Sequence, residues 1–200
     1  MDEWVSKDMV AVEALEPDAR LMLRVREGDS ASFGLLLERH RAPVIRFLYR
    51  MVQNQAVAEE LAQEAFLRVY RARARYEPTA RFTTWLFRIA MHLALNSLRD
   101  QRSWKYQESL DEEAEDTASR QLADRRPTIE QKLLDRARLD EVRRAVAGLP
   151  DKQRAAVLMH KYEEMEYSQI AQVLECSESA VKSLLFRAYE TLRARLAHLA

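Results

Sequence analysis

The chain has 200 residues and no formal net charge, since 32 basic residues balance 32 acidic ones, so overall charge alone does not favour binding to DNA. Only three glycines and five prolines interrupt a sequence rich in helix-forming residues, and the single cysteine excludes both an internal disulfide and a zinc site made of thiolates. We expect an all-α, cytoplasmic protein without membrane insertion, because no apolar run approaches the roughly 20 residues that span a bilayer and no signal-peptide pattern opens the chain.

The amino-terminal half is predicted to hold an extension, residues 1 to 17, and a domain of four helices, residues 18 to 102. Asp18 is expected to cap a short first helix. Ser30 is expected to cap a longer second helix. Pro43 should kink or divide that second helix, because proline removes a backbone N–H and its ring clashes with the preceding turn.

The third predicted helix, from about residue 56 to 73, has an apolar side and a polar side. Its apolar side has Val57, Leu61, Ala65 and Val69 at spacings of four. Its polar side carries Glu59, Glu60, Gln63 and Glu64, followed one turn later by Arg68 and Arg71. These side chains fit either ion pairs along the helix, such as Glu64 with Arg68, or a face that binds a partner.

Residues 76 to 82 are predicted to form a loop, and a fourth helix is expected to start at Thr83 or Thr84. The apolar stripe of this helix is expected to be Leu86, Ile89, Ala90, Leu93 and Leu98. The aromatic residues Phe82, Trp85 and Phe87 crowd its start beside Arg81 and Arg88. Aromatic rings between arginines suit stacking on unpaired bases, and the same rings also suit the core between helices.

Charges of opposite sign are separated along the chain. Eight arginines and only two acids lie between residues 68 and 102, whereas residues 108 to 116 carry six acids and no base. The basic segment suits contact with phosphates, and the acidic segment must avoid them. Residues 103 to 127 are therefore predicted to be an acidic tether between two domains.

The carboxy-terminal domain, residues 128 to 200, is predicted to open with a capping box of Thr128 and Gln131. Ser168 and Ser177 are expected to cap two helices near its end. The turn between these helices is too short to let them separate, and this arrangement is typical of a helix-turn-helix.

The second helix of this pair has an apolar inner side and a mixed outer side. The inner side is expected to hold Val181, Leu184, Leu185, Ala188 and Leu192. The outer side carries Ser179, Lys182, Ser183 and Phe186, with Arg187 beside them. An aromatic residue outside the apolar stripe, flanked by two bases, suits a helix that enters the major groove, although an ordinary helical hairpin with a solvated outer side has the same spacing.

Three segments resemble, in the same order, those of the extracytoplasmic-function (group 4) sigma factors of bacterial RNA polymerase. EELAQEAFLRVY at residues 59 to 70 resembles the family's polymerase-binding helix. FTTWLFRIA at residues 82 to 90 resembles its promoter-melting segment, and residues 149 to 188 resemble its carboxy-terminal domain, which reads the minus-thirty-five element. The resemblance covers about residues 18 to 102 and 128 to 197.

The resemblance implies a sigma factor with a region-2 domain and a region-4 helix-turn-helix domain. Its implied partners are core RNA polymerase, through the β′ clamp helices and the β flap, promoter DNA, and an anti-sigma factor; it implies no cofactor. The residues implied for polymerase binding are Glu60, Gln63 and Glu64. Those implied for the minus-ten element are Tyr76, Arg81, Phe82, Trp85, Arg88, His92, Asn96 and Arg99. Those implied for the minus-thirty-five element are Ser179, Lys182, Ser183, Phe186 and Arg187.

Four positions depart from the family pattern. His92 stands where the family usually has Asn, which puts the base preference at the minus-ten element in question. Glu175 stands where the family usually has Gly, so we expect strain of about 1 kcal/mol there or a different turn. Leu184 and Tyr189 replace two arginines, so phosphate contacts at those positions should be missing.

Two other classes of protein fit parts of the sequence. A conventional transcription factor would join the helix-turn-helix to an amino-terminal sensor, but neither a dimer interface nor a ligand pocket is visible in the sequence. An enzyme is disfavoured because the four histidines are scattered without carboxylate or cysteine partners at ligand spacing, and no glycine-rich phosphate loop is present. We therefore expect no catalytic residue and no metal site.

Overall fold

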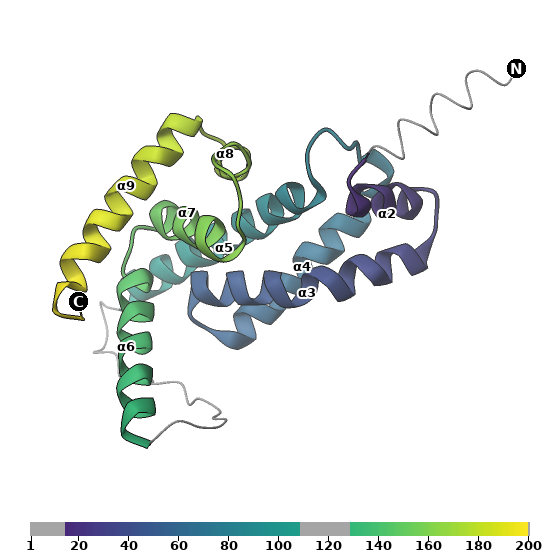
Figure 1. The fold of residues 1–200 in the computed structure, drawn as a ribbon. Coiled ribbons are helices and arrows are strands. Elements are labelled where there is room, and N and C mark those ends of the chain that lie inside the picture. Colours follow the sequence, from purple (N-terminus) through teal and green to yellow (C-terminus); the bar gives the residue numbers. More distant parts are fainter. Residues whose placement is uncertain (1–14, 109–128, 200) are drawn as a thin grey trace, which may run out of the picture.

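The computed structural model describes residues 15–108 and 129–199. In these ranges the chain forms α-helices and two short 3-10 helices, and no β-strand. Figure 1 shows their arrangement. The amino-terminal half contains α2 (Pro17–Arg26), α3 (Ser30–Val52), α4 (Gln55–Arg71) and α5 (Phe82–Glu108). The carboxy-terminal half contains α6 (Ile129–Ala147), α7 (Asp151–Tyr162), α8 (Tyr167–Leu174) and α9 (Glu178–Arg195). The prediction of an all-α protein is confirmed. Most of the predicted extension and tether, and the capping box at Thr128, lie outside the described residues.

The sequence predicted that Asp18 caps the first helix, and this prediction is wrong. α2 already starts at Pro17, the residue before Asp18, because proline is favoured at the first helical position, where its missing N–H costs nothing. The Asp18 carboxylate is buried, lies 2.7 Å from the His40 Nε2 atom, and accepts a hydrogen bond from Arg39. Asp18 therefore ties α2 to α3.

The start and the middle of α3 also differ from the prediction. Asp29, not Ser30, caps the helix, since its Oδ1 atom accepts from the backbone N–H groups of Ala31 (2.9 Å) and Ser32 (3.2 Å). Pro43 lies inside α3 without dividing it, so the helix runs on from Ser30 to Val52. The residues that follow the proline, such as Val44, are buried in the core, and this burial offsets the lost backbone hydrogen bond.

The helices of the carboxy-terminal half have the predicted order with one different start. Glu166, not Ser168, precedes the first turn of α8, and its N–H donates to the Gln169 side chain (2.9 Å). Ser177 caps α9 as predicted, because its hydroxyl accepts from the Ala180 N–H (3.2 Å). The two helices form a helix-turn-helix with Cys176 in the turn.

The predicted apolar stripes face the core. In α5 the buried members are Leu86, Ala90, Leu93 and Leu98, joined by Phe87, Met91 and Ala94, whereas the predicted Ile89 is only partly buried. In α4 the prediction was only partly right. The predicted Ala65 and Val69 are buried, and Ala58, Ala62 and Phe66, which were not predicted, are buried beside them. In α9 Val181, Leu185 and Ala188 are buried, and Leu184 and Leu192 pack at the edge. α5 starts at Phe82 rather than at Thr83 or Thr84.

The two halves of the chain touch each other directly. α8 packs against α5, α7 packs against α3, and buried apolar residues of both halves belong to one hydrophobic cluster. In Figure 1 α7 lies beside α3, while α6 extends away from the helices of the amino-terminal half. The sequence had indicated two domains on a tether and had given no sign of this contact.

Candidate nucleic-acid interface

One face of α5 carries a line of polar and aromatic side chains. Trp85, Arg88, His92, Asn96 and Arg99 follow one another at helical spacing, on the side away from the buried residues. Trp85 is half-buried and the other four are exposed. The structure thus brings together five of the eight residues predicted for the minus-ten element.

The loop before α5 is held at both ends. Arg26 donates to the Tyr76 carbonyl oxygen (3.2 Å), and the Phe82 N–H donates to the Glu16 carboxylate (3.1 Å). The carboxylate thereby satisfies one of the free N–H groups in the first turn of α5. Arg81, also predicted for the minus-ten element, is exposed on this loop. The anchored loop is therefore a preformed edge beside Trp85.

Tyr76 and Phe82 are not available for contact with bases in this conformation. Their exposed fractions are 4% and 0%, and their rings pack against the Trp85 ring with centroids 5.1 and 6.1 Å apart. These two buried rings pack against Trp85 and hold its indole ring in place. Of the two interpretations that the sequence left open for the cluster of Phe82, Trp85 and Phe87, the structure places Phe82 and Phe87 in the core, together with Tyr76.

This packing gives a stability prediction. Among residues 15–108 and 129–199 the buried Tyr76 hydroxyl has no hydrogen-bond partner, so Tyr76→Phe should leave the free energy of unfolding unchanged or raise it by about 1 kcal/mol. Phe82→Ala should lower it by about 3–5 kcal/mol, because it empties a packed site. Urea titrations of both variants measure this. A large loss of stability in Tyr76→Phe would contradict the packing seen here.

A pocket of about 540 Å³ opens between the loop and the α5 face. Its lining includes Arg75, Thr84, Trp85 and Arg88, and on the far side Gln172 of α8. An indole flanked by guanidinium groups, beside a concave surface, is what an unstacked base needs for stacking and for charge contacts to its backbone.

The outer side of α9 is exposed along its length. Ser179, Lys182, Ser183, Phe186 and Arg187 all reach solvent, and Phe186 is 68% exposed. The Ser183 hydroxyl donates to the Ser179 carbonyl oxygen of its own helix (3.0 Å). Within the described residues, no acidic partner neutralises Lys182 or Arg187. The five predicted residues therefore form one uncovered face.

The outer side of α4 combines acidic groups with an exposed leucine. Glu60 and Gln63 are exposed, while Glu64 pairs with Arg68 (2.7 Å), an interaction that lowers the pKa of the Glu64 carboxyl. Leu67, one turn beyond Gln63, is 48% exposed on the same side. The sequence-based residue set omitted Leu67, although its place off the apolar stripe was a usable signal.

Two of the departures from the family pattern fit the structure locally. Leu184 packs at the edge of the core, so it does not reach phosphates. Tyr189 is 38% exposed, and its partial burial, with Tyr167 nearby, raises the pKa of its hydroxyl.

Glu175 adopts the left-handed conformation at the end of α8, with φ 51° and ψ 53°. Glycine adopts this conformation without a steric cost, whereas other residues are strained there. We therefore expect Glu175→Gly to raise the free energy of unfolding by about 0.5–1 kcal/mol, and the melting temperature by about 1–4 °C. Differential scanning calorimetry measures the change. Glu164→Gly, at the other strained turn of this half (φ 51°), should act in the same direction, and a fall in both variants would contradict the prediction.

The histidines have more partners than the sequence indicated. Besides His40 with Asp18, the His198 Nε2 atom lies 2.5 Å from the Glu141 carboxylate. Among the described residues, no group of three or more His, Cys, Asp or Glu is placed to hold a metal ion. In that same part of the chain, no helix has the length and hydrophobicity of a membrane span.

The chain matches the family models "Sigma-70 region 2" over residues 36–103 and "Sigma-70, region 4" over residues 139–192. It is 38% identical to RNA polymerase sigma factor CarQ of Myxococcus xanthus, across 89% of this chain and 97% of that protein. It is 33% identical to the RNA polymerase sigma-H factor of Pseudomonas aeruginosa, across 88% of this chain and 92% of that protein. It is 31% identical to the ECF RNA polymerase sigma-E factor of Escherichia coli, again across 88% and 92%.

Two solved structures have the same fold. CnrH, in complex with the cytosolic domain of CnrY, superposes with a TM-score of 0.69 at 20% identity and covers 92% of this chain and 100% of its own. Sigma factor RpoE from Bartonella quintana, in complex with the anti-sigma factor NepR, has a TM-score of 0.64 at 19% identity, across 82% of this chain and 96% of its own.

Proposed function

The chain belongs to the extracytoplasmic-function sigma factors of the sigma-70 family and acts as an RNA polymerase sigma factor, and from this premise we propose that its three exposed faces divide the work of promoter recognition. The observation that carries the proposal is the separation of these faces on α4, α5 and α9, each opposite a buried stripe. The comparisons do not favour a conventional regulator with a sensor domain.

The α5 face is proposed to bind the displaced single strand of the minus-ten element. Trp85 offers a ring for stacking, supported by Tyr76 and Phe82, and Arg88 and Arg99 offer charge to the backbone. Unstacking a base costs a few kcal/mol, which stacking on Trp85 and charge contacts with Arg88 are suited to recover. In this proposal residues 18 to 102 are the region-2 domain.

The α9 face is proposed to enter the major groove of the minus-thirty-five element. Lys182, Ser183 and Phe186 lie where base edges would be read, and Arg187 lies at the side, where it would meet phosphate. Residues 128 to 200 then act as the region-4 domain, which would also meet the β flap of the polymerase.

The α4 face is proposed to bind the β′ clamp helices of core polymerase. Glu60, Gln63 and Glu64 supply polar contacts, and the exposed Leu67 supplies an apolar anchor among them. An anti-sigma factor is a further proposed partner, in line with the complexes recorded for CnrH and RpoE. We place the protein in the cytoplasm with the polymerase, and assign it no enzymatic activity of its own.

His92 gives a prediction about base preference. Because it lies on the α5 face between Arg88 and Asn96, His92→Ala should change the ranking of promoters that differ in the minus-ten element. The loss of one base contact should cost about 1–3 kcal/mol at the affected position, with binding to core polymerase unchanged. Permanganate footprints on a panel of promoters measure the ranking. An unchanged ranking would remove His92 from the reading face.

A further inference from the structure

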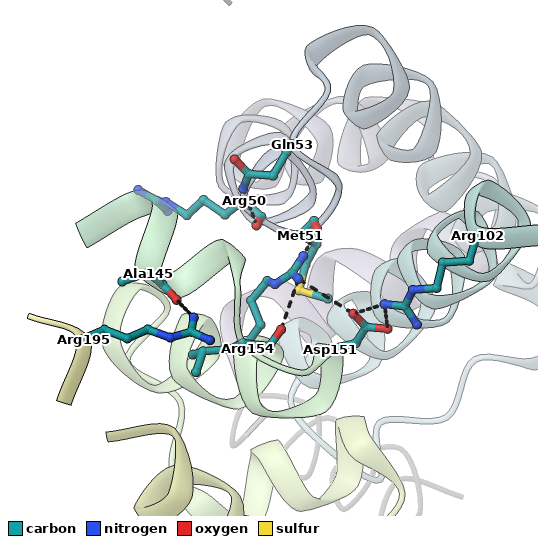
Figure 2. Close-up of polar contacts among 9 residues, drawn as sticks. Arg50, Met51, Gln53, Arg102, Ala145, Asp151, Arg154 and Arg195 are labelled. Carbon is teal, nitrogen blue, oxygen red and sulfur yellow. Dashed lines mark hydrogen bonds and ion pairs between the residues drawn. The ribbon is translucent and has the colours of Figure 1, made fainter. Parts of the chain in front are cut away.

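The contact between the two halves of the chain has a polar centre at Arg154. This residue of α7 is only 8% exposed. Its guanidinium donates to the Met51 carbonyl oxygen (2.5 Å) in the last turn of α3, and to the Leu149 carbonyl oxygen (3.1 Å) just before α7 (Figure 2). Carbonyls in the last turn of a helix have no partner within the helix and carry partial negative charge. A cation of the carboxy-terminal half thus satisfies a free carbonyl group at the end of a helix of the amino-terminal half.

Two further contacts join the halves around this centre. Arg102 of α5 donates from Nη2 to both oxygens of Asp151, at 2.7 and 2.8 Å, as Figure 2 shows. The Arg50 guanidinium of α3 lies 3.9 Å from the centre of the Tyr162 ring of α7. We call the three contacts, Arg154 with Met51, Arg102 with Asp151 and Arg50 with Tyr162, the interdomain latch.

The latch holds α8 over the middle of the α5 face. The Glu175 carboxylate lies 3.7 Å from the His92 Nε2 atom. Gln172 closes the far side of the pocket that Trp85 and Arg88 line. In this position α8 occupies the space in which a strand of DNA would run along Trp85, Arg88 and His92.

The other two faces stay uncovered in the same arrangement. Phe186 on α9 is 68% exposed and Leu67 on α4 is 48% exposed. The contact between the halves therefore hides one of the three proposed binding faces and leaves the other two accessible.

We propose that the free protein rests in a closed form, in which the interdomain latch holds α8 over the single-strand-reading face of α5, and that the latch must open before unpaired DNA binds. The identity of the ligand at the α5 face rests on the proposed function, whereas the closed form itself does not. Two of the latch contacts, Arg102 with Asp151 and Arg50 with Tyr162, involve exposed side chains, and exposed charge contacts are individually weak.

The first test measures the distance between the halves in the full-length protein. Nitroxide labels are placed at Glu38→Cys on α3 and Ala194→Cys on α9, in a Cys176→Ser background, since Cys176 is the only cysteine. Asp151→Asn with Tyr162→Ala removes two latch contacts from the carboxy-terminal half and leaves the buried Arg154 in place. Asp140→Asn on α6 is the matched control, because it also removes a carboxylate that pairs with an arginine, here Arg143 of the same helix.

We expect one narrow distance distribution in the parent and in the control, and a broader, longer one in the latch variant. A broad distribution in the parent, or an unchanged one in the latch variant, would overturn the closed form. Circular dichroism of each variant checks that the helices are retained.

The second test uses fluorescence anisotropy with two probes, a single-stranded DNA of random sequence about 12 nucleotides long and a duplex of the same length. Since apparent affinity scales with the fraction of open protein, the latch variant should bind the single strand about three- to tenfold more tightly and the duplex unchanged. An equal gain for both probes would reflect charge alone and overturn the proposal. Binding of core polymerase is measured in parallel, because its absence would refute the proposed function and leave the distance measurement standing.

Discussion

Replacing Lys182 and Phe186 with alanine is expected to abolish most discrimination at the upstream promoter element while polymerase assembly continues. Both side chains project from the exposed side of α9, and neither belongs to its buried stripe, so the helix-turn-helix should stay folded. Each good base contact is worth about 1–3 kcal/mol, a loss of roughly five- to 150-fold per contact. Run-off transcription from promoters that differ only in the minus-thirty-five element measures the change.

The control for this variant is Arg193→Ala. Arg193 is exposed two turns beyond Phe186 on α9 and pairs with Glu190, so its loss removes a cation without touching the proposed reading residues. Helices that enter the major groove read bases from their amino-terminal turns, so this control should keep its promoter preference. Equal losses in both variants would show that α9 acts through charge alone.

Replacing Gln63 and Glu64 with alanine is expected to weaken binding to core polymerase at least tenfold, with promoter preference retained in the complexes that form. A lost hydrogen bond costs about 0.5–1.5 kcal/mol, and one made by a charged group about 1.5–3 kcal/mol. The same change should alter the free energy of unfolding by less than about 0.5 kcal/mol, because the Glu64 pair with Arg68 is at the surface. Surface plasmon resonance with immobilised core polymerase measures the affinity.

Glu38→Ala is the matched control for that variant. Glu38 is an exposed acid on α3, outside α4, so its loss removes a carboxylate without changing the proposed polymerase-binding residues. It should therefore bind polymerase like the parent. Normal binding by the Gln63 and Glu64 double variant would remove α4 from the proposed polymerase interface.

Helix identity and most buried stripes were predictable because they depend on periodicity alone. The stripe of α9 and that of α5 follow from apolar residues three and four positions apart, and the structure buries them. Helix starts were less predictable, since several residues near each start are able to cap. Asp18 and Ser30 are residue types that commonly cap helices, but α2 begins earlier, at Pro17, and Asp29 caps α3.

The burial of Tyr76 and Phe82 was not decidable from the sequence. Both lie beside arginines, Tyr76 in the loop and Phe82 at the start of α5, and the contacts of Arg26 and Glu16 that hold this segment are not visible in the sequence. The contact between the halves was equally unpredictable. In the sequence Arg154 looks like an ordinary polar residue of α7, and only the fold shows that it donates to the Met51 carbonyl oxygen of α3. Contacts between residues far apart in the chain leave no periodic trace in the sequence.

The most direct test of sigma function is transcription by core polymerase and this chain from a library of random promoter sequences, with the start sites sequenced. We expect transcripts that need both components and that share two conserved elements at a fixed spacing. In the Lys182 and Phe186 double variant, only the upstream element should lose its conservation. Transcripts that match those of core polymerase alone, with no shared elements, would contradict sigma function.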